Sequence, residues 1–287
     1  MSGGKFVRDK KKLRLFRAAL LVITIACLLP VGRSCCLSVA HERQQRELRD
    51  LKGKAGVAAT LPGSMADEEG ASKEKADSGG LPVSAELAGL YEENRDLVGW
   101  LAVEGTEIDY PVVQCEDDEY YLSHNFRREE DRYGCLYVKS TADVNTPGTN
   151  FIIYGHHMKD GSMFGGLDKY GSESYFRSHR LVSFQTLYEE RAYEVMAVFQ
   201  TRISENEEGG GFRYYQFYQA GTKEEFRDFY ENVMALSMYD TGVTAEFGDT
   251  FLTMSTCSSH AENGRFVVVA KRLDEAGLSD TAGQSDK

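Results

Sequence analysis

The chain has 287 residues, a formal net charge of −12 and 41% apolar side chains, enough to build the core of one large domain or two small ones. An acidic balance of this kind argues against nucleic acid as the main partner. Basic charge is concentrated at the start, where residues 1–17 carry seven basic side chains and one acidic side chain.

An apolar stretch directly follows this basic start. Residues 18–32 carry no charge, although fifteen residues fall short of the roughly 20 that span a bilayer. The stretch 13–39 reaches that length if Arg17 and Arg33 extend to the two interfaces. We therefore predict a single-pass membrane anchor at 18–40, with the basic start in the cytoplasm and the remainder of the chain extracellular. A cleaved signal peptide is the alternative, but the stretch lacks a good small-residue cleavage site.

The next segment is polar and nearly free of aromatic residues. Residues 41–50 are charged and compatible with a helix, whereas 53–84 are rich in Gly, Ala, Ser, Glu and Lys. Such a composition buries too little apolar surface to fold, so we predict a polar stalk and flexible tether over 41–84. The folded domain is expected at 85–275 and a disordered tail at 276–287.

A leading helix and several short strands are predicted for the folded domain. Ser84 is suited to cap a helix that begins at Ala85, where apolar residues recur at helical spacing. Runs rich in aromatic and β-branched residues then predict strands, with a turn at Glu104-Gly105 between the first two. The predicted strands lie at 97–114 (two strands), 133–140, 150–157, 181–203 (a hairpin) and in a final pair that flanks the loop after Cys257.

A second helix is predicted between the hairpin and the final pair of strands. Thr222 and Glu225 have the spacing of a capping box, and Phe226, Phe229 and Val233 share one face of the helix. Many short strands, a leading helix and one long connecting helix predict a mainly β fold, an antiparallel barrel with helical additions.

The chain has six cysteines, and their pattern is not that of a disulfide scaffold. Three lie in or beside the apolar stretch, and no CxxC pair is present, which argues against a structural zinc site. Cys115 and Cys135 could pair in an oxidising compartment, but two small, half-buried thiols are the favoured interpretation.

The stretch "TMSTCSSHAENGRFVVVAK" places Cys257 at the end of one predicted strand and Arg265 at the start of the next. A thiol acts as a nucleophile only as a thiolate, so it needs a proton acceptor or a nearby positive charge. His156 and His157 end the strand "NFIIYGHH", after a glycine, Gly155, that permits a sharp exit from the strand. A Cys–His pair between Cys257 and either histidine is therefore predicted, and a packed cysteine with a surface histidine is the alternative.

Other chemistries fit this pattern less well. A metal site built from the two histidines at the strand end and His260 has no usual ligand spacing. A peptidase of the papain type uses the same Cys–His chemistry, but its cysteine comes before the histidine in the chain.

The stretch Thr253-Met254-Ser255-Thr256-Cys257, followed by Arg265, resembles the TLxTC…R signature of sortases, the membrane-anchored cysteine transpeptidases of Gram-positive bacteria. The segments "YGHHMKDGSMF", "LYEENRDLVGWLAVEGTEIDYPVVQ", "EYYLSHNF" and "LSMYDTGV" are similar to motifs of the class B branch, in the same order. The resemblance covers roughly residues 85–273 and departs from the signature at Met254, where leucine is usual.

The resemblance implies an eight-stranded β-barrel with an N-terminal helix and a long helix between the sixth and seventh strands. It implies that Cys257 is the nucleophile, that His156 is the catalytic histidine, and that Arg265 steadies the oxyanion or holds the substrate backbone. Ser255 and Thr256 match positions that line the acyl site. No metal and no cofactor are implied.

The implied reaction cleaves a C-terminal sorting signal of secreted proteins, an NPxTN-like or LPxTG-like pentapeptide, through a thioester. The acyl group then passes to an amine of a peptidoglycan precursor stem peptide. Two alternatives stay open at this point: a pilin-polymerising sortase, and a non-catalytic extracellular binding module tethered by the same anchor.

Overall fold

The computed structural model describes residues 3–60, 82–202, 212–257 and 264–274. The chain divides into two compact units, residues 1–47 and 48–287. Helix α1 (Gly3–Thr60) runs through the first unit and ends in the second, so the predicted anchor at 18–40 and the start of the predicted tether are helical. Within the described part of the chain, no helix is both long enough and apolar enough to cross a bilayer.

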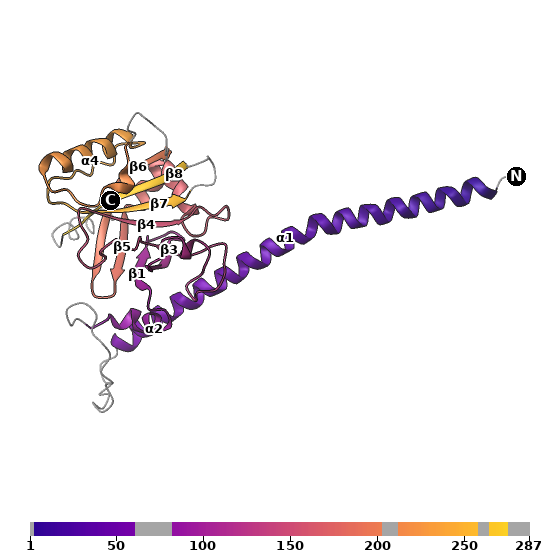
Figure 1. Cartoon of the computed structure of the whole chain (residues 1–287), viewed down its shortest axis with the longest axis horizontal. Coiled ribbons are helices and arrows are strands. Elements are labelled where there is room, and N and C mark those ends of the chain that lie inside the picture. The colour runs from indigo at the N-terminus through magenta and orange to yellow at the C-terminus, as the bar shows by residue number, and fades with distance from the viewer. Residues whose placement is uncertain (1–2, 61–81, 203–211, 258–263, 275–287) are drawn as a thin grey trace, which may run out of the picture. The chain divides into compact units, whose positions relative to one another are not determined.

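The second unit is a closed barrel of eight strands in the order β1-β2-β3-β4-β7-β8-β6-β5 (Figure 1). This confirms a mainly β fold and the eight-stranded barrel that the resemblance implies. The strands are β1 (Leu97–Ala102), β2 (Asp109–Val113), β3 (Leu136–Tyr137), β4 (Asn150–His156), β5 (Leu181–Thr186), β6 (Glu190–Arg202), β7 (Phe251–Cys257) and β8 (Gly264–Arg272).

The prediction that the barrel is antiparallel throughout is wrong at two of its strand pairs. β2 pairs with β3 in parallel, and so does β4 with β7. A parallel pair needs a crossover that returns the chain to the same end of the sheet. Between β4 and β7 this crossover contains β5, β6 and helix α4 (Lys223–Leu236), so the predicted long helix lies between the sixth and seventh strands.

Helix α4 covers the outside of the barrel beside β6 and β8 (Figure 1). Its capping box is present: the Thr222 hydroxyl accepts from the backbone N–H of Glu225, and the Glu225 carboxylate accepts from that of Thr222. Phe226, Phe229 and Val233 are buried against the barrel, as their spacing predicts. Burial of a large apolar side chain contributes about 1.5–3 kcal/mol, so this face holds the helix in place.

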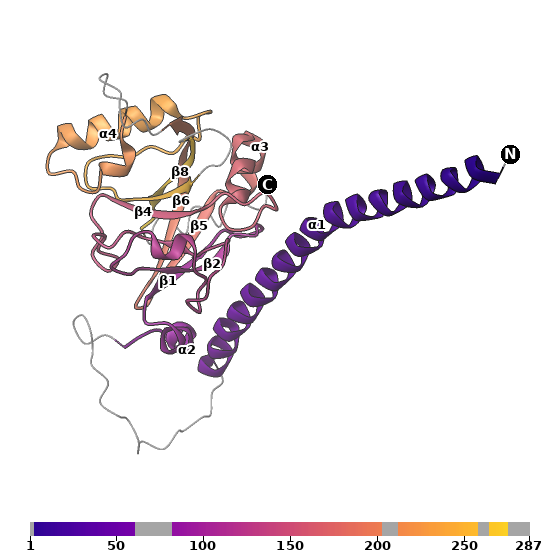
Figure 2. The same cartoon turned by 45° about the vertical axis from the view of Figure 1, so that its right-hand side comes forward.

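The helix α2 (Ala85–Glu93) lies at the side of the barrel away from α4 (Figure 2). Leu87 and Leu90 pack in a buried cluster with Trp100. Ser84 precedes the helix, but it makes no side-chain cap bond there. Its hydroxyl instead accepts from the side-chain amide of Gln185 on β5. The predicted side-chain cap is therefore replaced by a tertiary contact.

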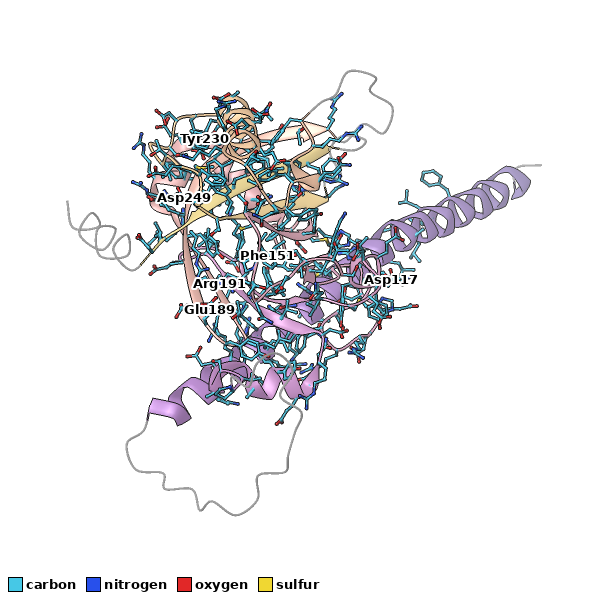
Figure 3. The ribbon with its side chains drawn as sticks, turned by 60° about the vertical axis from the view of Figure 1, so that its left-hand side comes forward. Asp117, Phe151, Glu189, Arg191, Tyr230 and Asp249 are labelled. Carbon is cyan, nitrogen blue, oxygen red and sulfur yellow. The ribbon has the colours of Figure 1, made fainter. Side chains whose placement is uncertain are left out.

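A buried arginine holds the segment that leads into β4. Arg191 is 2% exposed and bonds Glu189, the two side chains lying together in Figure 3. Its guanidinium also donates to the carbonyls of Val144 and Asn145, each at 2.8 Å. A buried cation is tolerated when its donors are paired in this way.

The second unit begins well before the predicted boundary at Ala85. Leu48 is fully buried in the same cluster as Trp100. Arg49 lies 3.5 Å from the Asp109 carboxylate, and the Lys52 ammonium lies 5.3 Å from the centre of the Trp100 ring. The described turns of α1 from Leu48 onward are therefore part of the folded unit. Composition alone did not indicate this, because Leu48 is the only buried apolar side chain among the residues described there.

Replacement of Leu48 tests this boundary. We expect Leu48→Ala to lower the free energy of unfolding of the full chain by about 2–5 kcal/mol, because it leaves a cavity beside Trp100. Leu51→Ala on the same turn is the matched control, since Leu51 is 40% exposed, and should change stability by less than about 0.5 kcal/mol. Denaturant unfolding followed by tryptophan fluorescence measures both. If both variants changed the free energy of unfolding by the same small amount, the folded domain would begin at Ala85, as the sequence predicts.

Candidate active site

The ends of β4 and β7 bring His156 and Cys257 to paired positions. The parallel ladder runs in unbroken register from Asn150 opposite Phe251 to His156 opposite Cys257. Neighbouring strands lie about 4.8 Å apart, so the two backbones are adjacent. The Thr253 hydroxyl bonds the Asn150 side chain at 2.7 Å in the buried part of the ladder, which helps to fix this register.

Arg265 lies near the start of β8, the strand next to β7 in the barrel. β8 is antiparallel to β7, with Ser255 opposite Val267. The ladder ends at this pair, and its register continued by two residues would set Arg265 opposite Cys257. Arg265 is half-buried, pairs with Thr201 on β6, and donates to the carbonyl of Gly264 at 2.8 Å. No carboxylate among the described residues forms an ion pair with its guanidinium, which leaves donors available to an anion.

The imidazole of His156 is oriented by a backbone carbonyl. Its Nε2 lies 2.6 Å from the carbonyl oxygen of Leu122, in the short helix η1 (Tyr120–Leu122). A carbonyl can only accept, so Nε2 carries a hydrogen and Nδ1 is the nitrogen that exchanges a proton. Sequence reasoning missed Leu122, because a backbone acceptor has no side-chain signature. Only its place in the motif "EYYLSHNF" pointed to this segment.

His157, the next residue, has different surroundings. Its Nε2 lies 2.5 Å from the Asp168 carboxylate in helix η2 (Gly165–Gly171). Successive side chains of a strand point to opposite faces, which separates the two adjacent histidines. The His157 side chain is 6% exposed, so it is a buried tie between the end of β4 and η2.

Gly155 is required for packing rather than for a sharp exit from the strand. It is a regular member of β4, paired with Thr256, and β4 continues through His156. A Cβ at this position would lie 2.4 Å from Leu136 Cδ2 and 2.8 Å from Phe164 Cδ2. The predicted sharp exit at Gly155 is therefore wrong: the glycine is needed because two buried side chains approach the strand closely.

The turn after His157 is held from inside the barrel. Met163 has a φ of 52°, which is uncommon for a residue other than glycine, and its N–H donates to the Tyr110 hydroxyl at 3.1 Å. Burial raises the pKa of Tyr110 to about 12, so this phenol stays neutral. The N–H of Phe164 donates to the His156 carbonyl at 3.0 Å, which folds the turn back onto the end of β4.

Ser255 and Thr256 are buried, with their hydroxyls engaged inside the protein. The Ser255 hydroxyl lies 2.7 Å from that of Tyr214, and Thr256 accepts from the N–H of Phe266 on β8 at 2.9 Å. Neither side chain is exposed. That they line the acyl site stays a prediction.

Two other thiols of this unit are free and poorly suited to nucleophilic chemistry. Cys135 is buried and Cys115 is half-buried, and they do not form a disulfide. Burial raises the pKa of both thiols, most strongly that of Cys135. Both thiols are unpaired, as the favoured interpretation has it, but Cys135 is fully buried and not half-buried. The described residues contain no cluster of three metal-ligating side chains, and His260 lies outside them.

Comparison with known proteins places this geometry in a family. The family profile described as "Sortase domain" matches residues 101–273. Sortase B of Listeria monocytogenes is 35% identical over 191 residues, which are 66% of this chain and 74% of that protein. The chain belongs to the sortase family, in its class B, and is a cysteine transpeptidase that acts on sorting signals.

Solved structures agree with this assignment. Sortase B of Bacillus anthracis superposes with a TM-score of 0.66 at 30% identity, over 83% of this chain and 97% of that one. A Staphylococcus aureus sortase B–substrate complex superposes with a TM-score of 0.64 at 25% identity, over 82% of this chain and 94% of that one. The expectation of a class B sortase is confirmed, and a non-catalytic binding module is not favoured.

The contrast between the thiols gives a direct test. At pH 7 we expect iodoacetamide to label Cys257 at least about tenfold faster than Cys115 or Cys135, whose raised pKa values keep them protonated. Peptide mapping by mass spectrometry after timed quenching measures the three rates. In denaturant the rates should converge. Equal labelling in the folded protein would remove the case for an activated Cys257.

Proposed function

We propose that Cys257, His156 and Arg265 form the catalytic group of this sortase. The observation that carries the proposal is the parallel register that pairs His156 with Cys257, with Arg265 set opposite in the extension of the β7–β8 register. Nucleophile, proton carrier and cation thus come from three neighbouring strands, a rigid support for a site.

In the first half of the reaction, the Cys257 thiolate attacks the carbonyl carbon of the scissile peptide bond in the sorting signal. The tetrahedral intermediate collapses as His156 gives its Nδ1 proton to the leaving amine. The peptide C–N bond breaks, a thioester to Cys257 remains, and the C-terminal fragment of the signal departs.

In the second half, an amine of a peptidoglycan precursor stem peptide attacks the thioester. His156 takes a proton from that amine at Nδ1, and the Cys257 thiolate leaves. The secreted protein is then joined to the precursor through a new amide bond. His156 ends with the proton that it gave away in the first half, so the cycle closes.

Arg265 stabilises the anionic intermediates of both halves. Its guanidinium stays protonated throughout and offers several donors in a fixed plane. Removal of one oxyanion donor typically costs on the order of 100-fold in rate or more. The absence of an ion-pair partner among the described residues supports this role, because its donors are not already committed to a carboxylate.

For Ser255 and Thr256 we propose an indirect contribution to the acyl site. Their hydroxyls bond Tyr214 and the backbone of β8, and so hold β7 against its neighbours just before Cys257. The substrate is proposed to be an NPxTN-like or LPxTG-like pentapeptide.

The location proposed for this reaction is the outer face of the cell membrane. The run 18–40 would anchor the chain, with the basic residues of 1–17 on the cytoplasmic side. Tethering raises the effective concentration of an enzyme whose two substrates sit at the same surface.

Capture of the thioester tests the proposed function. Wild-type protein incubated with a sorting peptide and no amine acceptor should gain the mass of the acyl fragment on the peptide that contains Cys257. Cys257→Ala should gain none and should lose turnover to background, because among the described residues no other cysteine pairs with His156 in the strand register. Turnover of Cys257→Ala well above background would exclude the thioester route.

Replacement of the two adjacent histidines should have different effects in a turnover assay with the same sorting peptide. His156→Ala is expected to reduce kcat/KM by at least about 100-fold, the usual size of a general acid–base contribution. His157→Ala should retain most activity but lower the melting temperature, since it breaks the buried tie to Asp168. The reverse pattern would move the catalytic role to His157.

A further inference from the structure

A polar cluster with a buried centre contacts the short helix η1, whose Leu122 carbonyl bonds His156. It consists of Asn94, Asp96, Tyr121 and Arg128, which come from the end of α2, the turn before β1, η1 and the loop that follows η1. Asn94 is 2% exposed and Tyr121 is 1% exposed, whereas the side chains of Asp96 and Arg128 are 23% and 50% exposed. The two buried polar groups would be costly to bury without hydrogen-bond partners.

The members of this cluster are closely interlinked. The Asn94 amide donates to the Tyr121 hydroxyl at 2.9 Å and to the Phe126 carbonyl at 2.8 Å. The Tyr121 hydroxyl in turn donates to the Asp96 carboxylate at 2.7 Å. Arg128 lies 3.0 Å from the same carboxylate and donates to the Asn94 side-chain oxygen at 3.2 Å. Burial raises the pKa of Tyr121, which keeps the phenol protonated as a donor.

The backbone of the same turn is held from the other side. The Tyr121 carbonyl accepts from the N–H of Cys135 at 2.9 Å. Gly134 has a φ of 60°, and a Cβ there would lie 2.3 Å from that carbonyl oxygen. The side chain and the carbonyl of Tyr121 are thus both fixed, and the next carbonyl along the chain is that of Leu122.

We propose that this cluster positions the catalytic histidine through the Leu122 carbonyl. The inference rests on the proposed role of His156 as acid and base. The carbonyl, 2.6 Å from Nε2, holds the hydrogen on that nitrogen and leaves Nδ1 to exchange a proton with the reacting amines. Asn94, Asp96, Tyr121 and Arg128 are positioning residues: none of them contacts the reacting atoms, and each acts through the turn.

The physical reason is the steep dependence of proton transfer on geometry. A shift of about 1 Å in a group remote from the chemistry can cost on the order of 100-fold in rate. An imidazole with a loosened Nε2 contact samples both neutral tautomers and a wider range of ring rotations. Loss of the cluster should therefore reduce kcat without a matching rise in KM.

Two variants each delete the polar group of one member of the cluster. Tyr121→Phe deletes one hydroxyl and keeps the ring. Arg128→Gly deletes the guanidinium at a residue with a φ of 64°, where glycine fits without strain, so this variant should fold even if the first does not. The matched control is Thr241→Val, which deletes a buried hydroxyl that donates to the Met196 carbonyl at 2.7 Å. This bond is remote from the proposed site. Thr201 on β6 pairs with Arg265, and Met196 lies five positions further along β6, roughly 16 Å away.

The readouts are steady-state kinetics with a sorting peptide and the ¹⁵N chemical shifts of the His156 ring. We expect a kcat about tenfold lower with KM unchanged in both cluster variants. Their ring shifts, recorded at a pH where the ring is neutral, should indicate mixed tautomers. Thr241→Val should leave both readouts as in the wild type. Lower kcat with unchanged ring shifts, or changed shifts with wild-type kcat, would overturn the inference. Full activity of His156→Ala would instead overturn the proposed function.

Discussion

The site depends above all on the parallel pairing of β4 with β7. Because the two strands run in the same direction and in register from Asn150–Phe251 onward, they end side by side at His156 and Cys257. A slip of one residue would turn one of the two to the other face of the barrel. The Asn150–Thr253 bond, buried in the ladder, opposes such a slip. The crossover through β5, β6 and α4 is what makes a parallel pairing possible.

Much of the orientation at the site comes from backbone groups and close packing. The Leu122 carbonyl sets the tautomer of His156, and the Phe164 N–H folds the following turn onto the end of β4. Gly155 allows Leu136 and Phe164 to approach the strand that carries the histidine. Such contacts hold the site to a narrow range of geometries, which is what proton transfer between His156 and the reacting amines requires.

Two segments remote from the site support this arrangement. Arg191 fixes the segment that leads into β4 by donating to two carbonyls before it. On the outer face of β1 and β2, the last turns of α1 cover Trp100 and pair with Asp109. The folded unit is therefore larger than the barrel and includes a helical segment whose composition is that of a tether.

Local signals in the sequence were enough to predict the barrel strands and the capping box at Thr222 and Glu225. Local motifs also indicated the candidate site residues Cys257, His156 and Arg265. Strand alternation, helix caps and motifs are all short-range features of a sequence. The parallel pairs, the burial of Leu48, the packing role of Gly155 and the acceptor at Leu122 were not predictable in this way. Each depends on atoms distant in the chain: Leu48 is buried in a cluster that includes Trp100, and the carbonyl that bonds the His156 ring belongs to Leu122, 34 residues earlier in the chain. Side-chain type determines which chemistry is possible, but long-range packing determines which groups meet.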